Sequence, residues 1–113
     1  MSRSSEITDP EQKLERALAA LAEREEAYEK ACYEFADAES EYRTQFAREF
    51  LLADGAVELK KQTAINKVAK HLKERDKKEA IRDFTKEKVK DAQLAVSARQ
   101  SLLSSARRTN EAL

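Results

Sequence analysis

The chain has 113 residues, 39% of them charged and 41% hydrophobic, with one glycine, one proline and no tryptophan. So few turn-forming residues exclude a β fold, which at this size would need a turn about every ten residues, and they favour long helices or a coiled coil. A single cysteine and a single histidine exclude an internal disulfide and a metal framework built on those ligands.

The net charge of zero hides a division of the chain into two oppositely charged halves. Residues 1–54 carry 7 lysines and arginines against 14 aspartates and glutamates, a net charge of −7. Residues 55–113 carry 15 basic against 8 acidic residues, a net charge of +7. The two halves are therefore electrostatic opposites.

Residues 1–8 form the first segment, and we expect a disordered tail there because the segment is short and polar. It lacks the apolar core of a signal peptide. No stretch of the chain approaches the roughly 18 apolar residues that indicate a membrane span. We therefore expect a cytoplasmic protein that has no contact with a membrane.

A single domain is predicted over residues 9–113, and its first element is a helix over about 10–54. Asp9 can cap this helix, Pro10 suits its first position, and Gln12 completes a capping box. Apolar residues then recur in steps of four and three, the heptad pattern of a coiled coil. The series consists of Leu14, Leu18, Leu21, Tyr28, Cys32, Phe35, Tyr42 and Phe46.

Gly55, the only glycine, suits the left-handed position that ends a helix and marks the start of a second arm over about 56–111. The apolar residues of this arm form two groups separated by a polar run, across which the apolar face shifts by about a third of a turn. Two structures remain open. One is a mostly continuous helix that supercoils, which the absence of Gly and Pro favours. The other has a kink or break near residues 73–77, where Asp76 and Glu79 could cap a new helix.

Together these elements predict an all-α fold, a long antiparallel helical hairpin or coiled coil that turns at Gly55. In such a hairpin residue 55 − n lies near residue 55 + n. Glu39 and Glu41 should therefore face Lys70, His71 and Lys73. Exposed ion pairs contribute only a few tenths of a kcal/mol each, but their pattern selects antiparallel pairing. Two helices alone leave part of each apolar stripe uncovered, so we expect a homodimer that forms a helical bundle.

The sequence offers no constellation for catalysis or cofactor binding. His71 lies among lysines, without a nucleophile or a carboxylate arranged around it, and is interpreted as a surface residue. Cys32 occupies a position of the heptad series, where a free cysteine acts as a small buried hydrophobe. The chain contains no glycine-rich phosphate loop. We therefore predict no enzyme activity, no cofactor, no metal and no small-molecule substrate.

A basic stretch over residues 60–90 is the one segment with a functional interpretation of its own, because it holds 12 lysines and arginines against 5 acidic residues. It could contact a phosphate backbone or complement the acidic first arm and other partners. No cluster of base-reading side chains accompanies it. The predicted nucleic-acid or partner contacts are Lys60, Lys67, Lys70, His71, Arg75, Lys78 and Arg82.

Two motifs resemble those of small helical accessory proteins of tailed bacteriophages and prophages. One consists of Tyr42-Arg43 and residues 50–61, where the first helix ends and is followed by an acidic residue, Gly, a small residue, Val and a basic run. The other is Gln-Ser-Leu-Leu at residues 100–103. The resemblance covers about two thirds of the chain and implies a phage or prophage protein in the cytoplasm of a bacterial host, without lending any catalytic residue.

Two functions follow as hypotheses. The first is a non-enzymatic coiled-coil module that forms a homodimer and binds another protein, a phage or host factor. The alternative is an accessory nucleic-acid-binding factor in phage DNA metabolism that uses the basic face of residues 60–90.

Overall fold

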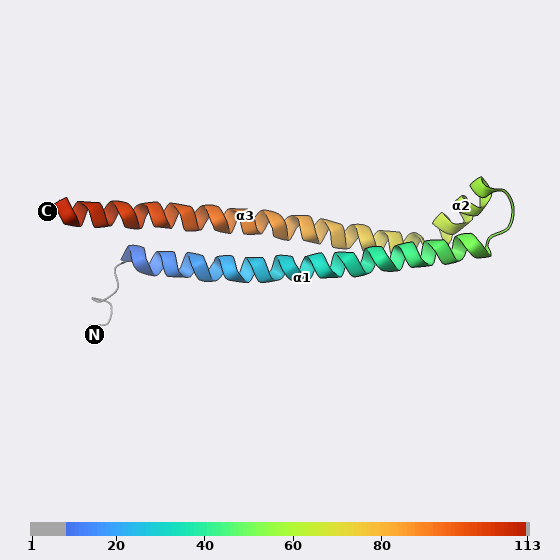
Figure 1. Cartoon of the computed structure of the whole chain (residues 1–113), viewed down its shortest axis with the longest axis horizontal. Coiled ribbons are helices and arrows are strands. Elements are labelled where there is room, and N and C mark those ends of the chain that lie inside the picture. The colour runs from blue at the N-terminus through green and yellow to red at the C-terminus, as the bar shows by residue number, and fades with distance from the viewer. Residues whose placement is uncertain (1–8, 113) are drawn as a thin grey trace. The chain divides into compact units, whose positions relative to one another are not determined.

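The computed structural model describes residues 9–112, and these form three helices without a strand. They are α1 (Asp9–Leu52), α2 (Val57–Lys67) and α3 (Ala69–Ala112) (Figure 1). The prediction of an all-α fold is confirmed. The predicted tail at residues 1–8 lies outside the described residues. None of the helices in residues 9–112 combines the length and the hydrophobicity that a membrane crossing requires.

Helix α1 is 44 residues long because no Gly or Pro interrupts the sequence after Pro10 and alanines are frequent. It begins at Asp9, one residue before the predicted start, and Asp9 forms an ion pair with Lys13 at 3.2 Å. It ends at Leu52, two residues before the predicted end. There the backbone N–H of Ala53 donates to the carbonyls of Glu49 (3.1 Å) and Phe50 (3.3 Å).

Gly55 lies in the short segment between α1 and α2 and has a φ of +102°. An L residue is strained at such a φ, whereas glycine is not. A Cβ built at Gly55 would lie 2.8 Å from Cδ2 of Leu59. That collision is with the far end of an exposed, flexible side chain, so the backbone strain is the larger part of the cost.

We expect Gly55→Ala to destabilise the protein by about 1–2 kcal/mol, because alanine at a positive φ carries a strain of that order. The free energy of unfolding, measured by urea denaturation followed by circular dichroism, checks this. Asp54→Ala is the matched control, since Asp54 is exposed and has no positive φ. Equal stabilities for the two variants would contradict the expectation.

The second arm is interrupted at Val68, and of the two structures left open the break near residues 73–77 does not occur. Helix α3 runs without a break through that polar run. Val68 has φ −102° and ψ 15°, outside the helical region, and Figure 1 shows α2 inclined to the start of α3. Hydrogen bonding is partly kept across the bend, because the Val68 N–H donates to the Ala64 carbonyl (3.0 Å) and the Leu72 N–H to the Val68 carbonyl (3.0 Å).

The bend has no glycine or proline at its centre, so its cause lies in packing. Val68 is 1% exposed and Ala64 is 0% exposed. Both small apolar residues are therefore fully covered at the point where α2 meets α3. The polar run that follows has no breaking residue, and it stays helical.

The chain divides into two compact units, each built from part of α1 and part of α3. Unit 1 consists of residues 1–28 and 85–113, of which 9–28 and 85–112 are described. Unit 2 consists of residues 29–84 and also contains α2. Within each unit the two long helices lie antiparallel, as a helical hairpin requires.

The core of each unit is thin. Val96 and Leu103, each 8% exposed, are the buried side chains of unit 1 among the described residues. Ala31 (4% exposed) joins Ala64 and Val68 in unit 2. The predicted heptad residues of α1 are mostly half-buried, and Leu18 is 46% exposed. Two packed helices cover each apolar stripe from one side only, which explains this partial burial.

Candidate functional site

The seven residues predicted as a basic contact face all lie in unit 2, and most of them point toward α1. Five are half-buried, namely Lys60, His71, Arg75, Lys78 and Arg82. Arg75 and Arg82 belong with Val89, Val96 and Leu103 to a series of α3 residues seven apart, and Val96 and Leu103 of that series are buried. His71 and Lys78 each lie four residues before a member of the series, on the same side of α3. The predicted basic face is therefore largely part of the seam between the helices.

Three of these cations lie over aromatic rings of α1. The guanidinium carbon of Arg82 is 4.4 Å from the centroid of the Phe35 ring. The guanidinium carbon of Arg75 is 5.5 Å from the centroid of Tyr42. The ammonium nitrogen of Lys60 lies 5.9 Å from the centroid of a third ring, Phe50. Such cation–π contacts are worth about 0.5–1 kcal/mol at exposed sites and more when desolvated.

Two further cations form ion pairs across the seam. The Lys78 ammonium donates to Oε1 of Glu34 at 3.2 Å, with both side chains partly buried. Lys67 lies 3.8 Å from a carboxylate oxygen of Glu49. In an antiparallel hairpin the mean of two paired residue numbers marks the centre of the turn. This mean is 56 for Lys78 and Glu34 and 58 for Lys67 and Glu49. The antiparallel register therefore lies one to three residues from the predicted centre at 55.

The detailed charge pairs differ from the prediction. Glu39 was expected to face Lys70, His71 and Lys73. Its carboxylate instead accepts a 2.6 Å hydrogen bond from Arg43 of its own helix. Glu41 accepts from Gln45, also within α1. Intrahelical partners four residues away are always within reach, whereas a partner across the seam requires the correct heptad position.

Arg82 also bonds within its own helix. Its Nε and Nη2 donate to Oδ1 of Asp83 at 3.2 and 3.0 Å. This hydrogen bond to Asp83 is the main reason why the pKa of Arg82 is raised above its ordinary value. The Arg82 guanidinium thus contacts Asp83 of its own helix and the Phe35 ring of α1.

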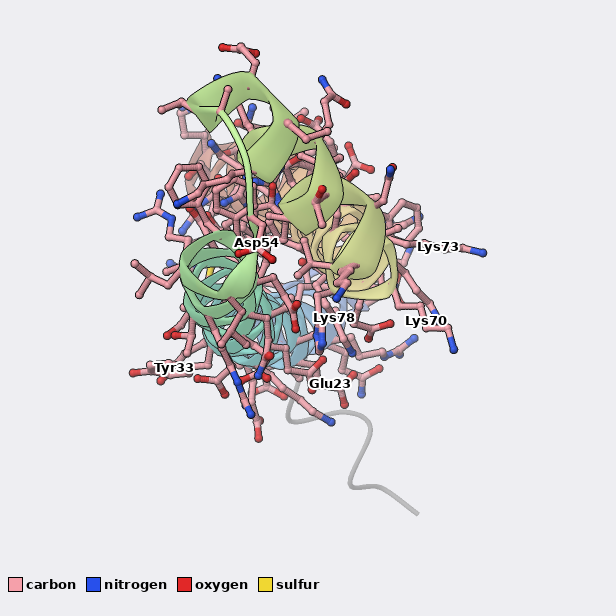
Figure 2. All side chains as sticks on the ribbon, turned by 90° about the vertical axis from the view of Figure 1, so that its right-hand side faces the viewer. Glu23, Tyr33, Asp54, Lys70, Lys73 and Lys78 are labelled. Atoms are coloured by element: carbon pink, nitrogen blue, oxygen red, sulfur yellow. The ribbon has the colours of Figure 1, made fainter. Side chains whose placement is uncertain are left out.

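Lys70 departs from this pattern. Figure 2 shows Lys70 and Lys73 extending away from the helices, whereas Lys78 lies toward α1. Lys70 is exposed, and so is Lys73. The exposed cations of residues 60–90 are all lysines, namely Lys61, Lys67, Lys70, Lys73, Lys77, Lys86 and Lys90.

A second basic group, which the sequence analysis did not single out, lies in unit 1. Lys13 and Arg99 together line two grooves between α1 and α3. The larger groove has a volume of about 390 Å³ and is also lined by Asp9, Pro10 and Leu102. The smaller groove, about 270 Å³, is also lined by Arg16, Ala17 and Ala95. Arg99 lies three heptads after Lys78, and this spacing is the sequence signal that could have predicted the group.

Large apolar side chains remain exposed in both units. In unit 2 they include four residues around the segment between α1 and α2, with Leu51 80% and Leu52 68% exposed. On α3, Phe84 is 62% exposed and Ile81, one helical turn before it, is 39% exposed. In unit 1, Leu94 is 70% exposed. Each unit therefore carries exposed apolar surface.

No cluster of three or more His, Cys, Asp or Glu side chains arranged to hold a metal ion occurs in the described part of the chain. Cys32 is a free, half-buried cysteine in the seam. The described residues thus form paired antiparallel helices with cations in the seam between them. Comparison of the chain with models of protein families, with curated proteins and with solved structures gave no match.

Proposed function

We propose that the protein is a non-enzymatic coiled-coil interaction module, a helical hairpin turning at Gly55 that pairs with a second copy of itself into a helical bundle. The homodimer then presents its remaining surface to another protein. The seam supports this proposal, because it uses the charge of the basic arm to hold the first helix. The basic residues that face α1 are therefore occupied inside the molecule.

The observation that carries the proposal is the large apolar surface left outside a thin core. Five hydrophobic side chains are buried, and eleven large hydrophobic side chains are about a third exposed or more among the described residues. Leu51, Leu52, Val57 and Leu59 are close in sequence around the segment between α1 and α2, and Ile81 and Phe84 lie one helical turn apart on α3. Exposed apolar patches mark protein interaction sites. A second copy is the simplest cover, since a two-fold interface uses the same patch on both subunits.

We expect the interface to include the α3 face of unit 2 that carries Ile81 and Phe84. Phe84→Glu places a charge in that patch and should weaken dimerisation at least tenfold, which corresponds to about 1.4 kcal/mol. Sedimentation equilibrium over a range of concentrations measures this change. Lys86→Glu is the control, because Lys86 is exposed on another side of the same helix.

Circular dichroism of both variants checks that they remain helical. Wild-type protein that sediments as a monodisperse monomer at high concentration would contradict the dimer. Equal weakening by both substitutions would mean that the Ile81–Phe84 patch lies outside the interface.

The alternative function, a nucleic-acid-binding factor that uses residues 60–90, has less support from the geometry. Arg75, Lys78 and Arg82 are engaged with α1, and Lys67 is paired with Glu49. Of the seven predicted contacts only Lys67 and Lys70 are exposed, so the predicted basic face itself offers little free charge to a phosphate backbone. Fluorescence anisotropy with duplex DNA at about 50 mM salt tests this alternative, and an absence of binding excludes it.

The origin in a phage or prophage stays a prediction from the motif resemblance. It implies a partner among phage or host factors in a bacterial cytoplasm. The identity of the neighbouring genes tests it, since genes for phage structural or replication proteins should flank this one.

A further inference from the structure

The grooves of unit 1 contain two cations at a place where unit 2 contains an ion pair. Arg99 follows Lys78 by 21 residues and Lys13 precedes Glu34 by 21 residues, three heptads in each helix. Antiparallel helices that keep one heptad register place equivalent positions opposite each other. Lys13 and Arg99 therefore share the grooves in the way that Glu34 and Lys78 share the seam.

Like charges at such a position repel one another unless an anion lies between them. Arg16 lines the smaller groove and adds a third cation. Within the described residues, neither Arg16 nor Arg99 has a carboxylate partner, and the one carboxylate at the grooves, Asp9, is paired with Lys13 at 3.2 Å. Three cations and one carboxylate leave two positive charges uncompensated.

The larger groove also has an apolar wall. Pro10, Leu102 and Ala106 line it together with the hydroxyl-bearing residues Ser105 and Thr109. Its volume of about 390 Å³ lies in the range of pockets that bind small molecules, about 300–1,000 Å³. The combination of a cationic end and an apolar wall fits a ligand that is itself amphiphilic.

We propose that these grooves bind an organic phosphate monoester, with the phosphate between Lys13, Arg16 and Arg99 and its apolar part against Pro10 and Leu102. A phosphate monoester carries close to two negative charges at neutral pH, which matches the uncompensated charge. Arginine is the preferred side chain for such an anion because its planar group donates two parallel hydrogen bonds. The bound phosphate would bridge α1 and α3 and stabilise unit 1.

The test uses the full chain and two probes, inorganic phosphate and phenyl phosphate, at constant ionic strength set with chloride. Binding is followed by NMR shifts of the backbone amides and by the thermal unfolding midpoint. We expect both probes to shift the amides around Lys13 and Arg99 and to raise the midpoint. Phenyl phosphate should bind several-fold more tightly than inorganic phosphate because of the apolar wall, and phenol alone should cause no shift.

The decisive variant is Arg99→Glu, which gives the position the opposite charge to Lys13, as in the Lys78–Glu34 pair. It should fold, should be at least as stable as the wild type without phosphate, and should bind phenyl phosphate at least tenfold more weakly. Arg107→Glu is the control, because it makes the same charge change at an exposed residue of α3 that lines neither groove. Its affinity for phenyl phosphate should stay within about twofold of the wild type.

Three results would overturn the proposal. One is an equal loss of affinity in both variants, which would mean that only the net charge of the protein attracts the anion. Another is an equal rise of the unfolding midpoint with chloride alone, which would indicate general screening. The third is an affinity for phenyl phosphate no greater than for inorganic phosphate. The affinity for the probes and the amide shifts at Lys13 and Arg99 report on the grooves and not on self-association, so failure here leaves the proposed interaction module untouched.

Discussion

Val68→Asp is expected to abolish cooperative unfolding of unit 2 and to lower the helical signal at 222 nm markedly. Val68 is 1% exposed and is the largest fully buried side chain among the described residues. A carboxylate at this place would be buried without a partner, at a cost on the order of 3 kcal/mol or more. Small domains are stable by only about 5–15 kcal/mol, and a core as thin as this one leaves little reserve.

The position also matters for the bend between α2 and α3. Val68 lies between the two helices and is covered together with Ala64. A charged side chain that escapes to solvent must rotate α2 away from its neighbours, and the ion pair of Lys67 with Glu49 would then be lost as well. Hydrogen exchange should therefore show a loss of amide protection that begins in α2.

Val57→Asp is the matched control, because it makes the same substitution at a valine that is 66% exposed. Val57 is the first residue of α2, where an acidic side chain interacts favourably with the helix dipole. The free energy of unfolding of the Val57→Asp variant should stay within about 0.5 kcal/mol of the wild-type value. Similar losses in both variants would show that Val68 is not a core residue in solution.

The first helix could be predicted closely because its signals are local. Asp9 and Pro10 define its start, and the heptad series through Phe35 and Tyr42 fixes the face that packs. Helix capping and heptad spacing depend on neighbouring residues and not on tertiary packing. The predicted and observed ends of the helix therefore differ by only one or two residues. The same reasoning gave the antiparallel register to within a few residues.

The bend at Val68 could not be predicted in the same way. Valine is compatible with a helix, and the neighbouring sequence contains no breaker, so nothing local marks the position. The bend follows from tertiary packing, which covers Ala64 and Val68 completely. The polar run, for which both a break and a continuous helix were open, is helical, and its residues Arg75 and Lys78 contact α1 across the seam.

The side of α3 on which the basic residues lie could be predicted in part from the sequence. Arg75 and Arg82 belong to the same heptad series as Val89, Val96 and Leu103, which places them on the packed face. Counting lysines and arginines by segment hides that relation, because it treats every cation of residues 60–90 as exposed. Long cationic side chains can cover apolar rings while their charge stays near solvent, and heptad position is the better guide to where they lie.

The contact between Arg82 and Phe35 provides the second large expected effect. Phe35 is half-buried, and the Arg82 guanidinium lies 4.4 Å from its ring centroid. We expect Phe35→Ala to destabilise unit 2 by about 2–3 kcal/mol, somewhat less than the roughly 3–5 kcal/mol for a fully buried phenylalanine. Urea denaturation followed at 222 nm measures the loss. Tyr33→Ala, at a residue of α1 that is 67% exposed, should cost less than about 0.5 kcal/mol.

A double-mutant cycle separates the cation–π contact from simple burial of the ring. Phe35→Leu keeps an apolar side chain, and Arg82→Met keeps much of the length of the arginine without its charge. The coupling energy should be about 0.5–2 kcal/mol and should change little with salt, because the ring shields one face of the guanidinium from ions. A coupling energy near zero would mean that Arg82 bonds to Asp83 in solution and faces away from Phe35. The cations of the second arm would then be available to an external partner.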